Sequence, residues 1–396
     1  MASSSDVDLA DRFDISGPTH MMKEKIIHWD KEEHRRCVAA CLVKGAYVVE
    51  NDLNRRRMWG KELAPAWWEN FGFCTVDVIN DDVIDDNDQI VTGTIYEHET
   101  PPGGGEPRHP LSPRYVVAFR GTMTWHPKAF VDLYLDKQVL FNTLQDSQRF
   151  RLAKAAVQKL VDTIHKGTGA CSDHAVGGRC VVWLVGHSLG ASVALEVGRV
   201  MMTEQGYNLP TFLFNPPQVS LAPVINLLHP NEKAKRHLHA ASSLLKVGLG
   251  KIMNSHEEHM EKLFERLSPW TPELYVHESD PICQGYIDYF EQRQLVQERF
   301  RGIGNSAMKL SYRDMFFSVL GKNKERPHLL PSALLWKNSR VDDAVEDHKK
   351  LSKCKMLQEQ LHQYKKLAFN AHSLEHWWKP DSELSLTKTQ YSYPSA

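Results

Sequence analysis

Hydrophobic and polar positions follow two different periods along the chain. Apolar side chains recur at helical spacing in 30–57, in 143–166 and from 189 onward, which predicts helices there. Two β-branched runs, 73–79 and 90–96, flank an acidic turn and predict a β-hairpin. Short, nearly continuous apolar runs predict further strands at 114–119, 180–185, 211–217 and 273–281.

The order of these elements indicates the fold class. Strands alternate with helical segments, and their apolar runs leave no polar face for solvent. Such strands are typical of a sheet that is buried on both sides. We therefore expect an α/β fold with a mostly parallel central sheet and helices on both of its faces.

The chain shows no linker that would divide it in two. We expect a single domain over 19–380, with flexible tails at 1–18 and 381–396. Two stretches interrupt the strand–helix rhythm and predict helical insertions near the loop edge of the sheet, at about 221–270 and 284–345.

The amino-acid composition bears on which binding partners the protein has. The 396 residues include 48 Lys and Arg against 49 Asp and Glu. This balance argues against nucleic acid or an anionic membrane surface as the main partner. No apolar run reaches the ~18 residues that cross a bilayer. The acidic N-terminus lacks the apolar core of a secretory signal. Seven scattered cysteines favour free thiols in a reducing compartment, so we expect a cytoplasmic protein.

The sequence GHSLG carries the strongest chemical signal. It fits the pattern G-x-S-x-G with Gly186, His187, Ser188, Leu189 and Gly190. It follows a buried strand and opens a helix, and such a sharp turn leaves no room for side chains two residues either side of the serine. The pattern predicts a nucleophile elbow that presents the Ser188 hydroxyl at the tip of the sheet.

A serine hydroxyl needs a histidine to accept its proton and an acid to orient that histidine. On this kind of sheet the chain order is serine, acid, histidine. Asp280 ends the strand of 273–281 and is the preferred acid, with Glu278 and Asp288 as alternatives. The segment FNAHSLEHWW offers His372 and His376 as the base.

Two further positions complete the predicted site. An oxyanion hole takes one donor from the backbone N–H after the nucleophile, here Leu189, and one from the loop after an earlier strand. Thr122, at the end of VVAFRGT, is the candidate for that second donor. His187 lies beside the nucleophile in the turn, where we expect it to pack or hydrogen-bond beneath the serine.

The succession of motifs resembles a known family. The segments VVAFRGT and VGHSLGA precede a strand ending in Asn-Pro, one ending in Ser-Asp-Pro, and an Ala-His followed by aromatics. This pattern is similar to the class 3 (fungal lipase-like) α/β-hydrolases over roughly 60–220 and 270–380. More narrowly it resembles plant lipase-like esterases, some of which are labelled GDSL esterase/lipase although this chain has GHSL.

The resemblance implies an α/β-hydrolase fold and a carboxylic ester hydrolase. It places the nucleophile on Ser188, the acid on Asp280, the base on His372 rather than His376, and the oxyanion residue on Thr122. No metal or organic cofactor is implied, and HEEH at 256–259 has its histidines three apart, not the four of a zinc motif.

Several alternatives stay open at this point. A lipase-like signalling or scaffold protein could keep these residues without turnover, and an acyltransferase would use the same ones. The expanded 221–270 region could cap the site or pack on the sheet. The basic amphipathic stretch 347–369 could lead the chain along the surface to His372, or make a transient contact with a membrane or partner. The substrate expected is a small-molecule or lipid ester.

Overall fold

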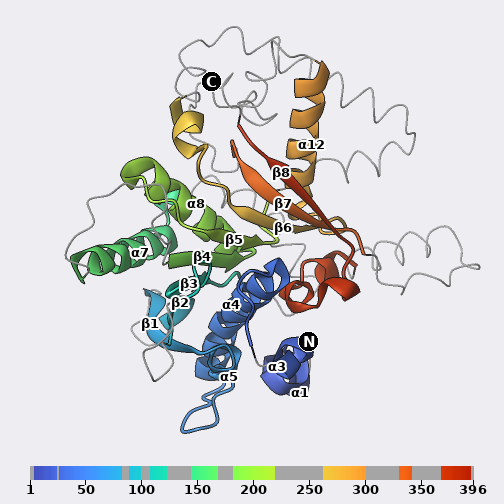
Figure 1. Cartoon of the computed structure of the whole chain (residues 1–396). Coiled ribbons are helices and arrows are strands. Elements are labelled where there is room, and N and C mark those ends of the chain that lie inside the picture. The colour runs from blue at the N-terminus through green and yellow to red at the C-terminus, as the bar shows by residue number, and fades with distance from the viewer. Residues whose placement is uncertain are drawn as a thin grey trace, which may run out of the picture.

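The computed structural model describes most of the chain in nine segments. These are 4–24, 26–82, 89–99, 108–122, 144–167, 182–218, 262–299, 330–340 and 367–393. Figure 1 shows a central twisted sheet with helices on both sides. This arrangement confirms the expected α/β class with a largely parallel sheet.

Eight strands of the described residues form one sheet. They are β1 Phe73–Asp82, β2 Gln89–His98, β3 Tyr115–Phe119, β4 Val182–His187, β5 Thr211–Phe214, β6 Glu273–His277, β7 Ala333–Asn338 and β8 Leu386–Tyr391. Their order in the sheet is the order in the chain. β3 to β7 run parallel, whereas β1, β2 and β8 pair antiparallel with their neighbours. The carboxyl ends of the five parallel strands therefore meet at one edge.

Helices cover both faces of this sheet. They are α1 Ser4–Asp11, α2 Phe13–Ser16, α3 Thr19–Glu24, α4 Glu32–Asn54, α5 Ala66–Glu69, α7 Gln148–Gly167, α8 Leu189–Gln205 and α12 Gln284–Arg299. Short 3-10 turns are η1 Leu144–Asp146, η2 Leu374–Trp378 and η3 Asp381–Glu383. In Figure 1, α4 lies on one side of the sheet, and α7, α8 and α12 lie on the other.

Strand β3 shows how the sequence builds a core on each face. Successive side chains of a strand point to opposite sides. Val117 and Phe119 join the core that contains α7 and α8, whereas Val116 and Ala118 join the core that contains α4 and the aromatic residues of η2. All four are at most 1% exposed. The continuous apolar run in the sequence is thus explained by burial on both faces.

The first residues depart from the expected flexible tail. Residues 4–16 form α1 and α2, and Phe13 packs edge-on against Trp67 with ring centroids 5.2 Å apart. Asp11 is fully buried and accepts hydrogen bonds from Lys44, Asn51 and Arg57. The prediction failed because acidic residues that look solvated in the sequence are here the partners of partly buried cations on and after α4.

The C-terminal part brings two further corrections. Residues 386–391, expected in a flexible tail, form the edge strand β8, whose exposed polar side chains give no hydrophobic signal. The 284–345 stretch, expected as a helical insertion, contains α12 but also the buried strand β7 of the sheet.

Other expectations lie outside the described residues. These are most of the 221–270 insertion with HEEH at 256–259, residues 300–329, and nearly all of the amphipathic stretch 347–369. The single-domain organisation stays a prediction.

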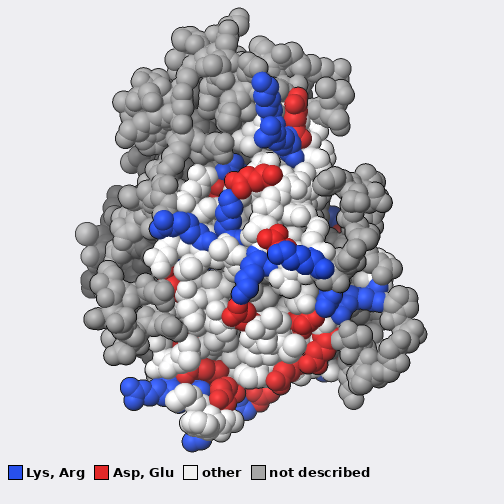
Figure 2. Space-filling model, turned by 90° about the vertical axis from the view of Figure 1, so that its left-hand side faces the viewer, with Lys and Arg blue, Asp and Glu red and all other residues white. Residues whose placement is uncertain are grey.

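Charge on the described surface is mixed. Figure 2 shows basic and acidic side chains interspersed on one face, with acidic side chains gathered along its lower margin. The described part of that face presents no broad basic surface, in keeping with the balanced composition.

The buried carboxylate of Asp11 gives a test of the N-terminal packing. We expect Asp11→Ala to lower the free energy of unfolding by about 3 kcal/mol, because Lys44 and Asn51 lose this buried acceptor, although Arg57 keeps its ion pairs with Asp8 and Asp52. Urea denaturation measures the change. Asp14→Ala is the matched control, since Asp14 is exposed and its ion pair within the described part of the chain is with neighbouring Arg12, and we expect little change. Equal stability of the Asp11 and Asp14 variants would contradict the packing.

Candidate active site

Ser188 occupies the sharp turn between β4 and α8. Its backbone angles, φ 55° and ψ −127°, lie where non-glycine residues are rare and strained by about 1–3 kcal/mol. The Ser188 amide donates to the Phe214 carbonyl oxygen at 3.0 Å, and the Ser188 carbonyl accepts from Ala191 and Ser192. The end of β5 and the first turn of α8 thus hold the strained conformation.

The two glycines of the motif are required by close backbone approach. A Cβ atom on Gly186 would overlap the Gly190 carbonyl, and one on Gly190 would overlap the Phe119 carbonyl at the end of β3. Both positions lie where backbone segments touch, which is the steric reason predicted from G-x-S-x-G.

Three predicted side chains meet at the carboxyl edge of the sheet. His372 Nε2 lies 2.8 Å from Ser188 Oγ, and His372 Nδ1 lies 2.7 Å from Asp280 Oδ2. An ionised carboxylate only accepts hydrogen bonds, so Nδ1 carries a proton, and in the neutral ring Nε2 accepts the serine O–H. Ser188 is 3% exposed and His372 8%, so this hydrogen-bonded array is shielded from bulk water.

Asp280 is buried in a set of hydrogen-bond donors. Its carboxylate accepts from His372, from Asn215 Nδ2 at 2.8 Å, from Cys283 Sγ at 3.0 Å and from the Ile282 amide at 3.0 Å. Burial by itself would raise the pKa of Asp280, but the His372 side chain and the other donors outweigh it and hold that pKa below its usual value. Burial and the Asp280 charge raise the pKa of Cys283, which therefore donates as a neutral thiol.

Asn215 is a site residue that the sequence reasoning did not single out. Trp377 Nε1 donates to Asn215 Oδ1, which fixes the amide so that Nδ2 donates to Asp280 and to the Ala371 carbonyl oxygen at 3.1 Å. Asn215 also has a positive φ of 46°. It joins the acid to the segment carrying His372. The only sequence signal was the Asn-Pro that ends β5.

The alternative residues lie elsewhere. His376 Nε2 bonds the Asn370 carbonyl oxygen at 2.9 Å. Glu278 is exposed and forms an ion pair with Lys337 at 3.1 Å. Asp288 lies partly buried on α12. Of these candidates, His372 contacts Ser188, and Asp280 contacts His372.

The two oxyanion candidates flank Ser188. Leu189 is the first residue of α8, and the amides of the first helical turn have no partner within the helix. On the other side, Gly121 is so close that a Cβ atom on it would lie 2.8 Å from Ser188 Cβ. Thr122, partly buried, follows directly.

His187 lies beneath the turn as expected. Its Nδ1 is 2.8 Å from the Tyr47 hydroxyl, and its Nε2 is 2.9 Å from the carbonyl oxygen of His372. It therefore contacts both the backbone and the ring of the proposed base, with the two ring centroids 5.0 Å apart.

Comparison with known proteins places the chain in a family. The chain is 32% identical to a protein of Arabidopsis thaliana that is named a GDSL esterase/lipase, over 96% of this chain and 98% of the relative. The chain belongs to the same esterase/lipase family. No family model and no solved structure matches it. The finer class 3 assignment is not confirmed by these comparisons.

Two other features of this esterase/lipase family member bear on its surface. Among the residues that the structure describes, no helix is long and apolar enough to cross a membrane.

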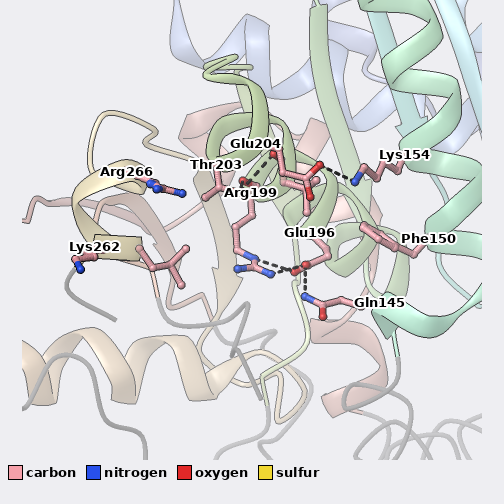
Figure 3. Close-up of a pocket in the computed structure, with 11 residues that line it drawn as sticks. Gln145, Phe150, Lys154, Glu196, Arg199, Thr203, Glu204, Lys262 and Arg266 are labelled. Carbon is pink, nitrogen blue, oxygen red and sulfur yellow. Dashed lines mark hydrogen bonds and ion pairs between the residues drawn. The ribbon is translucent and has the colours of Figure 1, made fainter. Parts of the chain in front are cut away.

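A pocket of about 590 Å³ lies between α7, α8 and residues 262–266, apart from the predicted site residues (Figure 3). Inside it Arg199 pairs with Glu196 of the same helix at 2.6 Å, and Lys154 of α7 pairs with Glu204 of α8 at 2.7 Å, so the second pair joins the two helices.

Replacement of Asn215 tests the support of the site. We expect Asn215→Ala to lower the free energy of unfolding by about 3 kcal/mol, because it leaves buried partners unsatisfied and places alanine at a positive φ. Asn215→Gly removes the same hydrogen bonds without that backbone strain, so it should be about 1 kcal/mol more stable than Asn215→Ala. Thermal and urea unfolding measure both. An Asn215→Ala protein as stable as wild type would contradict the assigned hydrogen bonds.

Proposed function

We propose that this protein is a serine hydrolase that cleaves carboxylic esters through Ser188, His372 and Asp280. The observation that carries the proposal is the hydrogen-bonded array on the strained turn, with 2.8 Å from His372 to Ser188 and 2.7 Å from His372 to Asp280. Such a chain of nucleophile, base and orienting acid is the arrangement that activates a serine hydroxyl.

The first half of the reaction forms an acyl-serine and releases the alcohol. Ser188 Oγ attacks the ester carbonyl carbon while His372 Nε2 takes the hydroxyl proton. Asp280 holds the ring through Nδ1–H and stabilises the imidazolium that forms. The backbone amides of Leu189 and Thr122 donate to the oxyanion. His372 then gives its proton to the leaving alkoxide, and an acyl-serine remains.

The second half repeats the sequence with water. His372 takes a proton from water, the hydroxide attacks the acyl carbonyl, and collapse of the second tetrahedral intermediate returns the proton to Ser188. The balance needs only ester and water, and yields carboxylic acid and alcohol. No metal or organic cofactor enters any step.

Fold and family support the finer assignments in this proposal. The positive φ of Ser188, the order β4–serine–helix and the chain order serine, acid, histidine support an α/β-hydrolase fold of the class 3 type. The relative's printed name, esterase/lipase, supports acyl esters, including lipid esters, as the substrate class. The cytoplasmic location stays a prediction.

Hydrolysis of p-nitrophenyl esters by the purified full chain tests the assigned roles. We expect kcat to fall by roughly 10⁴-fold or more in Ser188→Ala and His372→Ala, and by about 10³- to 10⁴-fold in Asp280→Asn, because the three groups act as a unit. Acetate, butyrate and palmitate esters compared on wild type give the preferred acyl length.

His376→Ala is the matched control. It removes a nearby histidine of the same segment whose Nε2 bonds the Asn370 carbonyl oxygen and whose ring lies beside His277, so kcat should stay within about threefold of wild type. Loss of activity in His376→Ala with retention in His372→Ala would move the base to His376. Folded wild type without activity on any ester would overturn the proposal and favour the signalling or scaffold alternative.

A further inference from the structure

A hydrogen-bond path runs beneath Ser188 from one side of the site to the other. The Gly121 amide donates to the Tyr47 hydroxyl at 2.7 Å. That hydroxyl lies 2.8 Å from His187 Nδ1, and His187 Nε2 lies 2.9 Å from the carbonyl oxygen of His372. The path begins in the turn that carries the oxyanion candidate Thr122 and ends on the backbone of the proposed base.

The donors and acceptors along this path can point only one way while His187 is neutral. A carbonyl oxygen accepts, so His187 Nε2 must carry the proton. Nδ1 of the neutral ring then accepts, and the hydrogen it receives comes from the Tyr47 O–H. The Tyr47 oxygen accepts the Gly121 amide in turn. One hydroxyl and one imidazole thus satisfy a backbone N–H and a backbone C=O on opposite sides of Ser188.

The Tyr47 hydroxyl can donate the hydrogen bond to His187 Nδ1 that this arrangement requires. Burial raises the pKa of Tyr47 to about 12, so the phenol keeps its proton at neutral pH and remains a donor. Its ring meets His187 edge-on, with centroids 5.9 Å apart. Tyr47 comes from the middle of α4, an element far from the elbow in sequence.

A second contact fixes the other side of Gly121. Arg120 Nη1 donates to the Gly121 carbonyl oxygen at 2.7 Å, and Arg120 is held by Glu50 of α4 at 3.5 Å. The Gly121–Thr122 peptide is trans, so the Thr122 N–H points opposite to that carbonyl and away from the Arg120 guanidinium. Both faces of the Gly121 backbone are therefore held by hydrogen bonds that depend on α4.

We propose that Tyr47 and His187 are positioning residues that tie the oxyanion turn at Gly121–Thr122 to the backbone of His372. This rests on the proposed function, because it assigns a role in the same ester hydrolysis. Their hydrogen bonds reach backbone groups, and the His187 ring also lies beside the imidazole of His372, with centroids 5.0 Å apart. They keep the oxyanion donor and the base at a fixed distance from Ser188, which matters because oxyanion donors act through geometry set before the reaction.

Variants of the two residues separate the two ends of the path. Tyr47→Phe keeps the ring but removes the hydroxyl. His187→Asn keeps an acceptor near the position of Nδ1 and loses the donor to His372, whereas His187→Gln keeps a donor near Nε2 and loses the acceptor for Tyr47. We expect kcat on p-nitrophenyl esters to fall about 10- to 100-fold in Tyr47→Phe and in both His187 variants, with KM changed less than threefold. This is below the roughly 10²- to 10³-fold loss on removal of an oxyanion donor itself.

Tyr96→Phe is the matched control. Tyr96 is fully buried and its hydroxyl also bonds to α4, at the Leu42 carbonyl oxygen 3.1 Å away, but it lies outside the path. We expect its kcat to stay within twofold of wild type. Urea unfolding places all variants on one stability scale. Equal kcat in Tyr47→Phe, both His187 variants and wild type would overturn the proposal, as would an equal kcat loss in Tyr96→Phe.

A spectroscopic signature tests the path without relying on activity. In protein labelled with ¹⁵N-histidine, two-bond ring couplings report which nitrogen carries the proton, and His187→Gln identifies the His187 signals among the 20 histidines. We expect His187 protonated on Nε2 at neutral pH, with its Nδ1 shift moving in Tyr47→Phe. His187 protonated on Nδ1 alone would overturn the path. Inactive wild type with the expected His187 signature would instead overturn only the proposed hydrolysis.

Discussion

The backbone strain at Ser188 is the constraint on which the rest of the site depends. A non-glycine residue at φ 55° persists only where its surroundings determine it. Here the Phe119 carbonyl at the end of β3 lies close against Gly190. The Ser188 amide donates to the Phe214 carbonyl oxygen of β5, and the first turn of α8 begins at Leu189. Without any one of these neighbours the turn would relax, and the Ser188 hydroxyl would move away from His372 Nε2.

Hydrogen bonds between neighbouring strand ends of the parallel sheet link the turn at Ser188 to the candidate acid and base. At the carboxyl edge, the Ser188 amide bonds the end of β5, and the Asn215 amide bonds the Tyr275 carbonyl oxygen of β6. Asp280 lies three residues after the end of β6. Neighbouring strand ends therefore present Ser188, Asn215 and Asp280 in order, as expected where ligand sites lie outside the carboxyl ends of parallel strands. The segment 367–378 then packs over the edge, and Asn215 fixes it through Trp377 and the Ala371 carbonyl.

The sequence was informative where the structure follows from interactions between residues close together in the chain. The apolar runs predicted β3 to β6, the glycine pair predicted the elbow, and the strand ending at Asp280 pointed to the residue that contacts His372. It was uninformative where the interaction is long-range. Tyr47 lies 140 residues from His187, and nothing in the helical pattern of α4 distinguishes its hydroxyl from any other. Asp11 looked like part of a solvated acidic tail, although its partners on and after α4 bury it. β8 has an exposed polar sequence and owes its place to pairing with β7.

The most direct test of the central claim is the position at which the folded protein reacts with a fluorophosphonate. Full-length wild type is reacted to completion and digested, and tandem mass spectrometry locates the adduct. The account predicts one adduct per chain, on Ser188, and none when the protein is unfolded before the reaction. An adduct on another serine such as Ser192, or no adduct on the folded protein, would contradict the claim that this turn holds an activated nucleophile.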